Sequence, residues 1–179
     1  MSLTEAAQVA QAIPEGWTRE SMRHAAQNVR RALILKTLWY PELLNGMVDS
    51  ARQYLESAGV SASAIEVRTV PGSFELPLGV EICAPASPGR PAADLVVALG
   101  CIIKGDTPHF DFVSGAATDG LMRVQLDQRV PVGFGVLTVG NREQAEARIG
   151  KGAEAAQAAF MMHLLARQSG RRLQGPFQE

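Results

Sequence analysis

Residues 94–103, DLVVALGCII, and residues 132–139, VGFGVLTV, decide the fold class of this chain. Both segments are apolar almost throughout and lack the alternation of polar and apolar residues that a half-exposed strand shows. Parallel strands that are covered by helices on both faces have this nearly continuous pattern. We therefore predict that these segments are two strands of a parallel sheet.

Two further segments towards the N-terminus, ALILKTL (32–38) and IEVRTV (65–70), are also rich in residues that favour strands. Helical patterns separate the four segments. In the clearest one, apolar residues recur every three or four positions over 43–58 and Gly59 follows, and weaker patterns lie around 76–82, 113–124 and 153–165. The order predicts an α/β fold with a four-stranded parallel sheet and right-handed crossovers, whose ligands bind beyond the carboxyl ends of the strands.

Length and charge limit the number of domains and the kind of partner. The chain has 179 residues, which fit one domain, and a formal net charge of −1, which gives no bulk attraction to nucleic acid or to an anionic membrane. Residues 1–30 are polar and interrupted by Pro14 and Gly16, so we expect an N-terminal extension outside the core that is partly ordered at best. Residues 31–169 are predicted to form the single domain, and residues 170–179 a fraying tail.

Cysteine usage and hydropathy bear on the cellular setting. Cys83 and Cys101 lie far apart in the sequence among apolar residues, as small core residues do, rather than as a redox or metal-binding pair. The first thirty positions have no apolar signal-peptide region, and no later run approaches the roughly 18 apolar residues of a membrane span. We expect a soluble, cytoplasmic protein.

The segments that follow the strands are WYPE (39–42), PGSFELP (71–77), GCIIKGDTPHFDF (100–112) and TVGNREQ (138–144), and all four are expected at one edge of the sheet. In the third, Gly105, Asp106 and Thr107 stand at a strand-to-helix turn, where backbone N–H groups and a hydroxyl can bind a small phosphate. The chain has no P-loop motif and no G-x-G-x-x-G after its first strand. Nucleoside triphosphate and dinucleotide binding are therefore disfavoured.

Beside this turn, His109 is flanked by Phe110 and Phe112. Histidine is the side chain best suited to exchange protons near neutral pH. Its place next to an anion-binding turn at the carboxyl end of a strand favours a proton-transfer role over a loop histidine without function.

Asp106, His109 and Asp111 also offer a metal-binding alternative, and the chain has two further histidines. A metal site would combine Asp106, His109 and Asp111, but no further His or Cys accompanies them and hard cations usually take more oxygen ligands. His163, among the Met and Leu residues of the last helical pattern, and His24, in the polar extension, are interpreted as structural or solvent-exposed.

The segments PGSFELP, ALGCIIKGDTPHFD, PVGFGVLT and EQAEAR, in this order, resemble the 6,7-dimethyl-8-ribityllumazine synthase family over residues 31–167. The resemblance implies a flavodoxin-like three-layer sandwich and a homopentamer with active sites between neighbouring subunits. It also implies a cofactor-independent transferase of riboflavin biosynthesis, which uses no metal. Such an enzyme condenses 5-amino-6-(D-ribitylamino)uracil with 3,4-dihydroxy-2-butanone 4-phosphate and releases phosphate and water. Riboflavin synthase is a candidate partner.

The same resemblance assigns roles to individual residues. His109 is the catalytic proton carrier. The pyrimidine and the ribityl chain are bound by Trp39, Ser73, Phe74, Glu75, Cys101, Ile102 and Ile103, and by Phe134 of the adjacent subunit. The phosphate is bound by Gly105, Asp106, Thr107 and Arg148. Many family members have Phe and Asn where this chain has Trp39 and Tyr40, and the larger indole can still stack on a pyrimidine.

The chain departs from the family pattern after Arg148, where GKGAEAA (150–156) follows about four residues early. This shortening and the N-terminal extension favour a simple pentamer over a larger hollow shell. Two rival functions remain open. One is a weakly catalytic paralogue that acts as a flavin- or pyrimidine-binding pentameric scaffold, and the other is a flavodoxin-like FMN carrier, which would explain the sheet but not the GDTPHFD turn.

Overall fold

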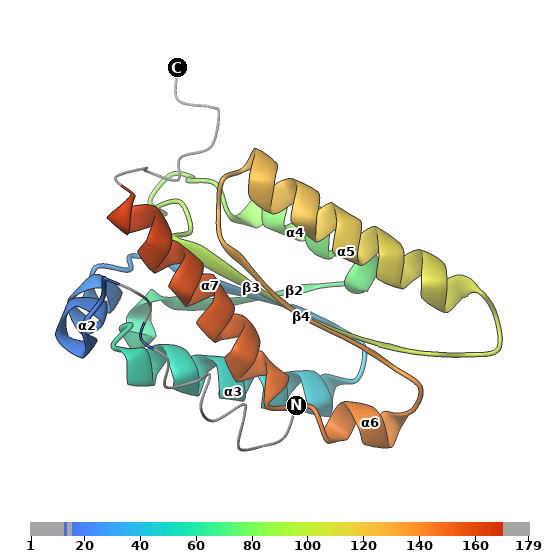
Figure 1. Cartoon of the computed structure of the whole chain (residues 1–179). Coiled ribbons are helices and arrows are strands. Elements are labelled where there is room, and N and C mark those ends of the chain that lie inside the picture. Colours follow the sequence, from blue (N-terminus) through green and yellow to red (C-terminus); the bar gives the residue numbers. More distant parts are fainter. Residues whose placement is uncertain (1–12, 14–15, 170–179) are drawn as a thin grey trace.

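The computed structural model describes residue 13 and residues 16–169, and it is built around a four-stranded sheet (Figure 1). The strands are β1 (Ala32–Thr37), β2 (Ile65–Val70), β3 (Leu95–Ile103) and β4 (Val132–Val139). They lie in the order β2-β1-β3-β4, and all three pairings are parallel. The predicted four-stranded parallel sheet is confirmed, with strand ends within one residue of the predicted segments.

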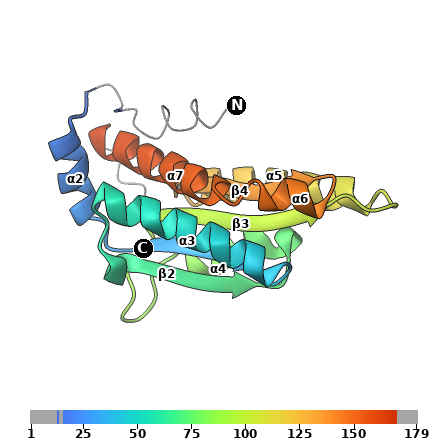
Figure 2. The same ribbon diagram turned by 90° about the horizontal axis from the view of Figure 1, so that it is seen from below.

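Helices cover both faces of the sheet and make three layers (Figures 1 and 2). One face carries α4 (Leu76–Cys83) and α5 (His109–Asp127), and the other carries α3 (Pro41–Ala58) and α7 (Lys151–Gln168). The shorter elements are α2 (Arg19–Gln27), α6 (Arg142–Glu146) and the 3₁₀ turns η1 (Ala62–Ala64) and η2 (Ser73–Glu75). None of the helices in the described part of the chain is both long and apolar enough to cross a membrane.

Each face of the sheet has its own apolar core, because successive strand residues point to opposite sides. On β1, Ile34 belongs to the cluster under α3 and α7, together with Met47 and Phe160. Its neighbours Leu33 and Leu35 belong to the cluster under α4 and α5. All five side chains are fully buried, which accounts for the continuous apolar sequence of the strands.

Helix α7 packs directly on its neighbours through glycine backbone. A Cβ at Gly133 of β4 would collide with the carbonyl oxygen of Ala155, and one at Gly152 would collide with the carbonyl oxygen of Met47. The C-terminal helix is therefore held close to both β4 and α3, which places the segment before it at the same end of the molecule as the start of α3.

The N-terminal extension contributes to the core, contrary to the expectation that residues 1–30 lie outside it. Helix α2 begins after Thr18, whose hydroxyl accepts a hydrogen bond from the Ser21 amide while the Ser21 hydroxyl accepts one from the Thr18 amide. Ala25, Ala26 and Val29 are buried in the cluster under α3 and α7. The rest of the extension, residues 1–12, 14 and 15, and the predicted tail 170–179 lie outside the described residues.

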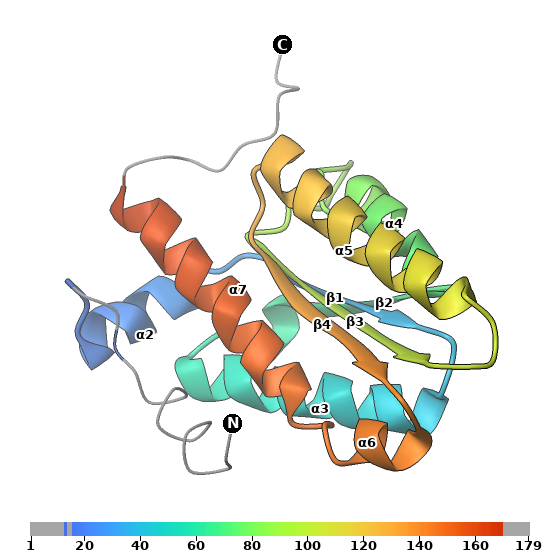
Figure 3. The ribbon, with the colours of Figure 1, turned by 45° about the vertical axis from the view of Figure 1, so that its right-hand side comes forward.

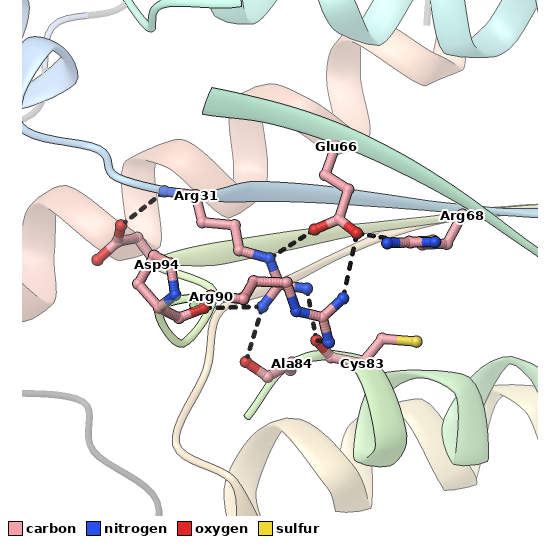
Figure 4. A network of polar contacts seen from close by, with 8 residues as sticks. Arg31, Glu66, Arg68, Cys83, Ala84, Arg90 and Asp94 are labelled. Atoms are coloured by element: carbon pink, nitrogen blue, oxygen red, sulfur yellow. Dashed lines mark hydrogen bonds and ion pairs between the residues drawn. The ribbon is translucent and has the colours of Figure 1, made fainter. Parts of the chain in front are cut away.

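At the amino end of the sheet, the buried guanidinium of Arg31 joins β1 to the connection between α4 and β3 (Figure 4). It donates to Glu66 Oε2 at 2.7 Å and to the carbonyl oxygens of Cys83, Ala84 and Pro91 at 2.6, 3.3 and 3.0 Å. Because an arginine presents all its donors in one plane, this single side chain fixes a surface connection that has little core of its own.

Candidate active site

The carboxyl ends of all four strands point to one end of the molecule (Figure 3). The start of α3, the turn η2, the start of α5 and helix α6 gather there, so the four segments that follow the strands share one edge as predicted. The helices begin earlier than expected, however. Helix α5 starts at His109, so the true loop after β3 is 104–108 and His109 is a helical residue rather than a loop residue.

Trp39 stands at the turn from β1 into α3, with 66 % of its surface exposed. The preceding residue, Leu38, still donates its amide to the Val70 carbonyl at 3.1 Å, and α3 begins at Pro41. The indole thus projects from a turn of only two residues. Its exposed face is available for stacking on a planar ligand.

The turn after β2 brings Glu75 beside Trp39. The ideal Cβ position at Gly72 lies 3.0 Å from Glu75 Oε2 and 3.7 Å from Trp39 Nε1, so glycine leaves room for both side chains. Ser73 is buried, and its Oγ lies 2.6 Å from the ideal Cβ position of Gly100 on β3. Three predicted pyrimidine-site residues, Trp39 after β1 and Ser73 and Glu75 of η2, therefore lie at this edge.

The last residues of β3 line the same edge with decreasing burial. Cys101 is 5 % exposed, and burial raises the pKa of its thiol to about 11. The thiol therefore stays protonated at neutral pH and serves as a packing group rather than a nucleophile. Ile102 and Ile103 are half-buried, whereas Phe74, on η2, is 61 % exposed.

The turn 104–108 leads straight into the amino end of α5. Lys104 donates its amide to the Val139 carbonyl at 2.8 Å, which extends the sheet by one residue. Asp106, Thr107 and His109 are exposed, and open space surrounds Gly105. No side chain caps α5, so the first-turn amides and the helix dipole of this 19-residue helix favour an anion at this place.

The alternative metal site is not formed by the residues proposed for it. Across residue 13 and residues 16–169, no three His, Cys, Asp or Glu side chains gather as metal ligands, and this includes Asp106, His109 and Asp111.

Phe134 and Arg148 lie in a separate place. They line an open groove of about 550 Å³ along the outer edge of β4, with Lys151 and Glu154 of α7. The Arg148 guanidinium donates to the Gln144 carbonyl at 2.8 Å and is exposed. Neither Trp39, Glu75 nor His109 lines this groove, so a single chain does not join the two groups of predicted residues into one pocket.

Two residues of this edge were missed in the sequence. Thr37, the last residue of β1, is 1 % exposed, and its hydroxyl has no partner among the described residues. Tyr40 has a left-handed backbone, with φ 54° and ψ 60°. A signal for Tyr40 was present, because the residue before a proline is restricted and disfavours the α-helical region. No pattern in the sequence distinguishes Thr37 from an ordinary strand residue.

Comparisons with known proteins point to one family. The model of the 6,7-dimethyl-8-ribityllumazine synthase family matches residues 29–167. A 6,7-dimethyl-8-ribityllumazine synthase of Leifsonia xyli is 48 % identical over 137 residues, which are 73 % of this chain and 82 % of the relative. Those of Kineococcus radiotolerans and Rhodopseudomonas palustris are 47 % and 39 % identical, over 73 % and 74 % of this chain and 81 % and 83 % of the relatives. The chain belongs to the 6,7-dimethyl-8-ribityllumazine synthase family.

Proposed function

We propose that this chain condenses 5-amino-6-(D-ribitylamino)uracil with 3,4-dihydroxy-2-butanone 4-phosphate to give 6,7-dimethyl-8-ribityllumazine, phosphate and water. Family membership makes it an enzyme of riboflavin biosynthesis. The observation that carries the proposal is the edge of the sheet, which holds both the uncapped start of α5 at His109 and the neighbouring pair Trp39 and Glu75. The scaffold alternative is not favoured, because the matching relatives are named as synthases.

The pyrimidine and its ribityl chain fit the region around Gly72. The exposed Trp39 indole offers a stacking face, and Glu75 carries carboxylate oxygens that accept hydrogen bonds from hydroxyl groups. Ser73, Phe74 and the end of β3, Cys101 to Ile103, complete this part of the proposed site. Cys101 contributes contact surface there, because its thiol is neutral.

The butanone phosphate fits the turn 104–108. Gly105, Asp106 and Thr107 place backbone N–H groups and a hydroxyl at the uncapped start of α5. A guanidinium binds two phosphate oxygens at once, which is the role proposed for Arg148. These groups stabilise the negative charge that develops as phosphate departs.

His109 is proposed to move protons. The primary amine of the pyrimidine attacks the ketone, and water is lost to form a Schiff base. Phosphate is then eliminated to leave an enol, which tautomerises to a carbonyl. The second amine adds to this carbonyl and loses a second water to close the ring. Each of these steps transfers a proton, and an exposed imidazole at the start of α5 is placed beside the phosphate turn. Much of the acceleration comes from holding the two substrates together.

The complete site is proposed to lie between subunits of a homopentamer. Support comes from the separation of the two groups of residues, because the β4 groove lined by Phe134 and Arg148 includes no residue of the Trp39 group. A groove on one subunit can complete the Trp39 edge of the next. We further propose a cytoplasmic setting, which suits the free thiols Cys83 and Cys101.

The direct test is a two-substrate assay that follows the absorbance of the lumazine product. His109→Ala is expected to lower kcat by up to about a hundredfold, near the lower end of what general acid–base catalysis contributes. Arg148→Ala is expected to raise KM for the butanone phosphate more than KM for the pyrimidine. His24→Ala, at an exposed position on α2, is the matched control and should behave as wild type. Absence of product with the wild-type protein, or tight riboflavin binding without turnover, would contradict the proposal.

A further inference from the structure

Tyr40 adopts a backbone conformation that its residue type disfavours. Among the described residues, only Tyr40 and Arg129 are non-glycine residues with positive φ, at 54° and 50°. A bulky side chain in the left-handed region is strained, and such strain persists only where the surroundings enforce it. Arg129 lies in the α5–β4 turn at the far end of the sheet, whereas Tyr40 lies between Trp39 and the start of α3.

The turn geometry explains why a left-handed residue is needed. Leu38 is still paired with β2 through the Val70 carbonyl, while the Tyr40 carbonyl already accepts the Leu44 amide at 3.0 Å as the first hydrogen bond of α3. The chain thus has two residues in which to change from strand to helix. Pro41 at the first helical position excludes an earlier start for α3, because it disfavours helical backbone at the residue before it.

The Tyr40 side chain is anchored on the apolar core. Its ring is half-buried against the core cluster under α3 and α7. Next to it, Arg142 of α6 pairs with Glu146 at 2.7 Å and approaches Glu42 of α3 to 3.9 Å. The contact of the ring with the core holds the Tyr40 side chain, and the approach of Arg142 to Glu42 links the start of α3 to α6.

The consequence is carried by Trp39. With Tyr40 left-handed, the Trp39 indole projects from the sheet edge and is exposed. The ideal Cβ position of Gly72 lies 3.7 Å from Trp39 Nε1 and 3.0 Å from Glu75 Oε2, so the indole and the carboxylate are neighbours. A change of the Tyr40 backbone to the right-handed or extended region would redirect the residue before it. The relation between the indole and the carboxylate therefore depends on this one dihedral pair.

We propose that Tyr40 is a positioning residue, whose left-handed backbone, anchored by its ring and by Pro41, aims the Trp39 indole at the pyrimidine beside Glu75. This inference rests on the proposed function, since it assumes that Trp39 stacks on the pyrimidine. It adds a residue that does not itself touch the substrate.

The test uses a Trp17→Phe background, in which Trp39 is the only tryptophan of the chain. Tyr40→Phe keeps the ring and should keep the pyrimidine KM. Tyr40→Gly and Tyr40→Ala both remove the ring and differ by one methyl group, but only alanine disfavours the left-handed region. We expect Tyr40→Ala to raise the pyrimidine KM by about tenfold. This change corresponds to ~1.4 kcal/mol, the free-energy cost of left-handed backbone for a residue that has a Cβ. Tyr40→Gly, which does not have this cost, should raise the KM by less.

Two readouts separate positioning from loss of stability. The KM for the butanone phosphate should stay within about twofold in all three variants, since a positioning effect on Trp39 concerns only the pyrimidine. Iodide quenching of Trp39 in the ligand-free protein should change in Tyr40→Ala and not in Tyr40→Phe. Equal pyrimidine KM and equal quenching for Tyr40→Ala and wild type, whatever the melting temperature, would overturn the inference.

Failure of the inference is distinct from failure of the proposed function. Trp39→Ala in the same background tests the stacking role alone. An unchanged pyrimidine KM in this variant would show that Trp39 does not stack on the pyrimidine, so that Tyr40 would have no stacking residue to position. Quenching of the ligand-free protein needs no substrate, so it reports on the turn even for a chain that forms no lumazine.

Discussion

Gly100 of β3 leaves room for a buried hydroxyl at the edge of the sheet that holds the proposed site. A Cβ at this position would lie 2.6 Å from Ser73 Oγ and 3.3 Å from Leu76 Cδ1. Real side-chain atoms do not approach so closely, so the η2 turn must shift away from the strand. Because Ser73 precedes Glu75 in that turn, the shift moves the proposed ribityl contact as well.

Gly100→Ala is therefore expected to raise the pyrimidine KM and to destabilise the fold by about 1–3 kcal/mol, the usual cost of overpacking. Steady-state kinetics and urea unfolding measure the two effects. Gly115→Ala on α5 is the matched control, because open space surrounds that glycine and alanine favours a helix by about 0.5–1 kcal/mol. A Gly100→Ala variant with unchanged pyrimidine KM would show that the turn adapts without loss.

His163 makes stability depend on pH at a distance from the site. Its ring lies in the core with Nδ1 3.2 Å from the Asp94 carbonyl oxygen, and Nε2 has no partner among the described residues. Burial lowers the pKa of His163, and Arg167 lowers it further, against the opposing effect of the Asp94 charge and carbonyl. The unfolded chain therefore binds a proton at higher pH than the folded one.

The stability contributed by neutral His163 is thus present above the unfolded pKa of about 6.5 and is lost as the pH falls below it. We expect the free energy of unfolding of wild type to fall between about pH 7 and pH 5, by about 1.4 kcal/mol for each unit by which the pKa is lowered. His163→Gln, which stays neutral, should lose less over the same range in urea titrations. His24→Gln, at an exposed position, should follow wild type, and parallel curves for wild type and His163→Gln would contradict this assignment.

At the scale of elements, Arg31 locks the α4–β3 connection to the sheet. Its side chain is 4 % exposed and bonds to Glu66 and to three carbonyl oxygens, whereas Arg68, which also pairs with Glu66, is 55 % exposed. Partial burial raises the pKa of Glu66, but hydrogen bonds and charge from Arg31 and Arg68 lower it by more. Glu66 therefore stabilises the fold above the ordinary carboxyl range, and this contribution is lost as the pH falls through the lowered pKa.

Arg31→Met should cost about 3–5 kcal/mol of unfolding free energy, because it leaves buried acceptors without donors. Arg68→Met, an exposed pair partner of the same carboxylate, should cost about 1 kcal/mol or less. Urea unfolding compares the two variants, and amide exchange should rise in residues 84–94 for Arg31→Met alone. Similar losses in both variants would show that the carbonyl contacts contribute little.

The first residues of the helices depend on features that the spacing of apolar residues does not predict. The inner strands β1 and β3 were predicted closely because burial on both faces leaves few polar residues in them. Helix α5 begins at His109, before its first buried residue, because Pro108 can initiate a helix that the apolar pattern only reveals a turn later. The five residues of α6 were not predicted, since one short turn carries too few apolar positions to show a period.

At the scale of the whole molecule, the outer faces of α4 and α5 expose large apolar side chains. Leu78 and Ile82 on α4 are 59 % and 66 % exposed, and Met122 and Leu126 on α5 are 54 % and 65 % exposed. Each pair is spaced by four residues and so shares a helix face. Apolar surface of this kind supports the proposed homopentamer, in which neighbouring subunits would cover it.

Leu126→Glu is accordingly expected to lower the sedimentation coefficient, because a buried charge would separate the subunits. Because the proposed site is shared between subunits, lumazine formation should fall by at least tenfold, which corresponds to ~1.4 kcal/mol. Gln53→Glu, at an exposed position of α3 on the other face, is the control and should leave both measurements unchanged. A monomeric wild type with full activity would contradict the shared site.

The sequence by itself determined the four parallel strands, the edge of the sheet at which the segments that follow them meet, and the family, because these depend on local apolar patterns and on short motifs. Tertiary structure alone decided the burial of Ala25 and Ala26, the meeting of Trp39 with Glu75 at Gly72, and the separate groove of Arg148. These features arise from contacts between segments far apart in the chain, and periodicity along one segment does not record which other segment will cover it.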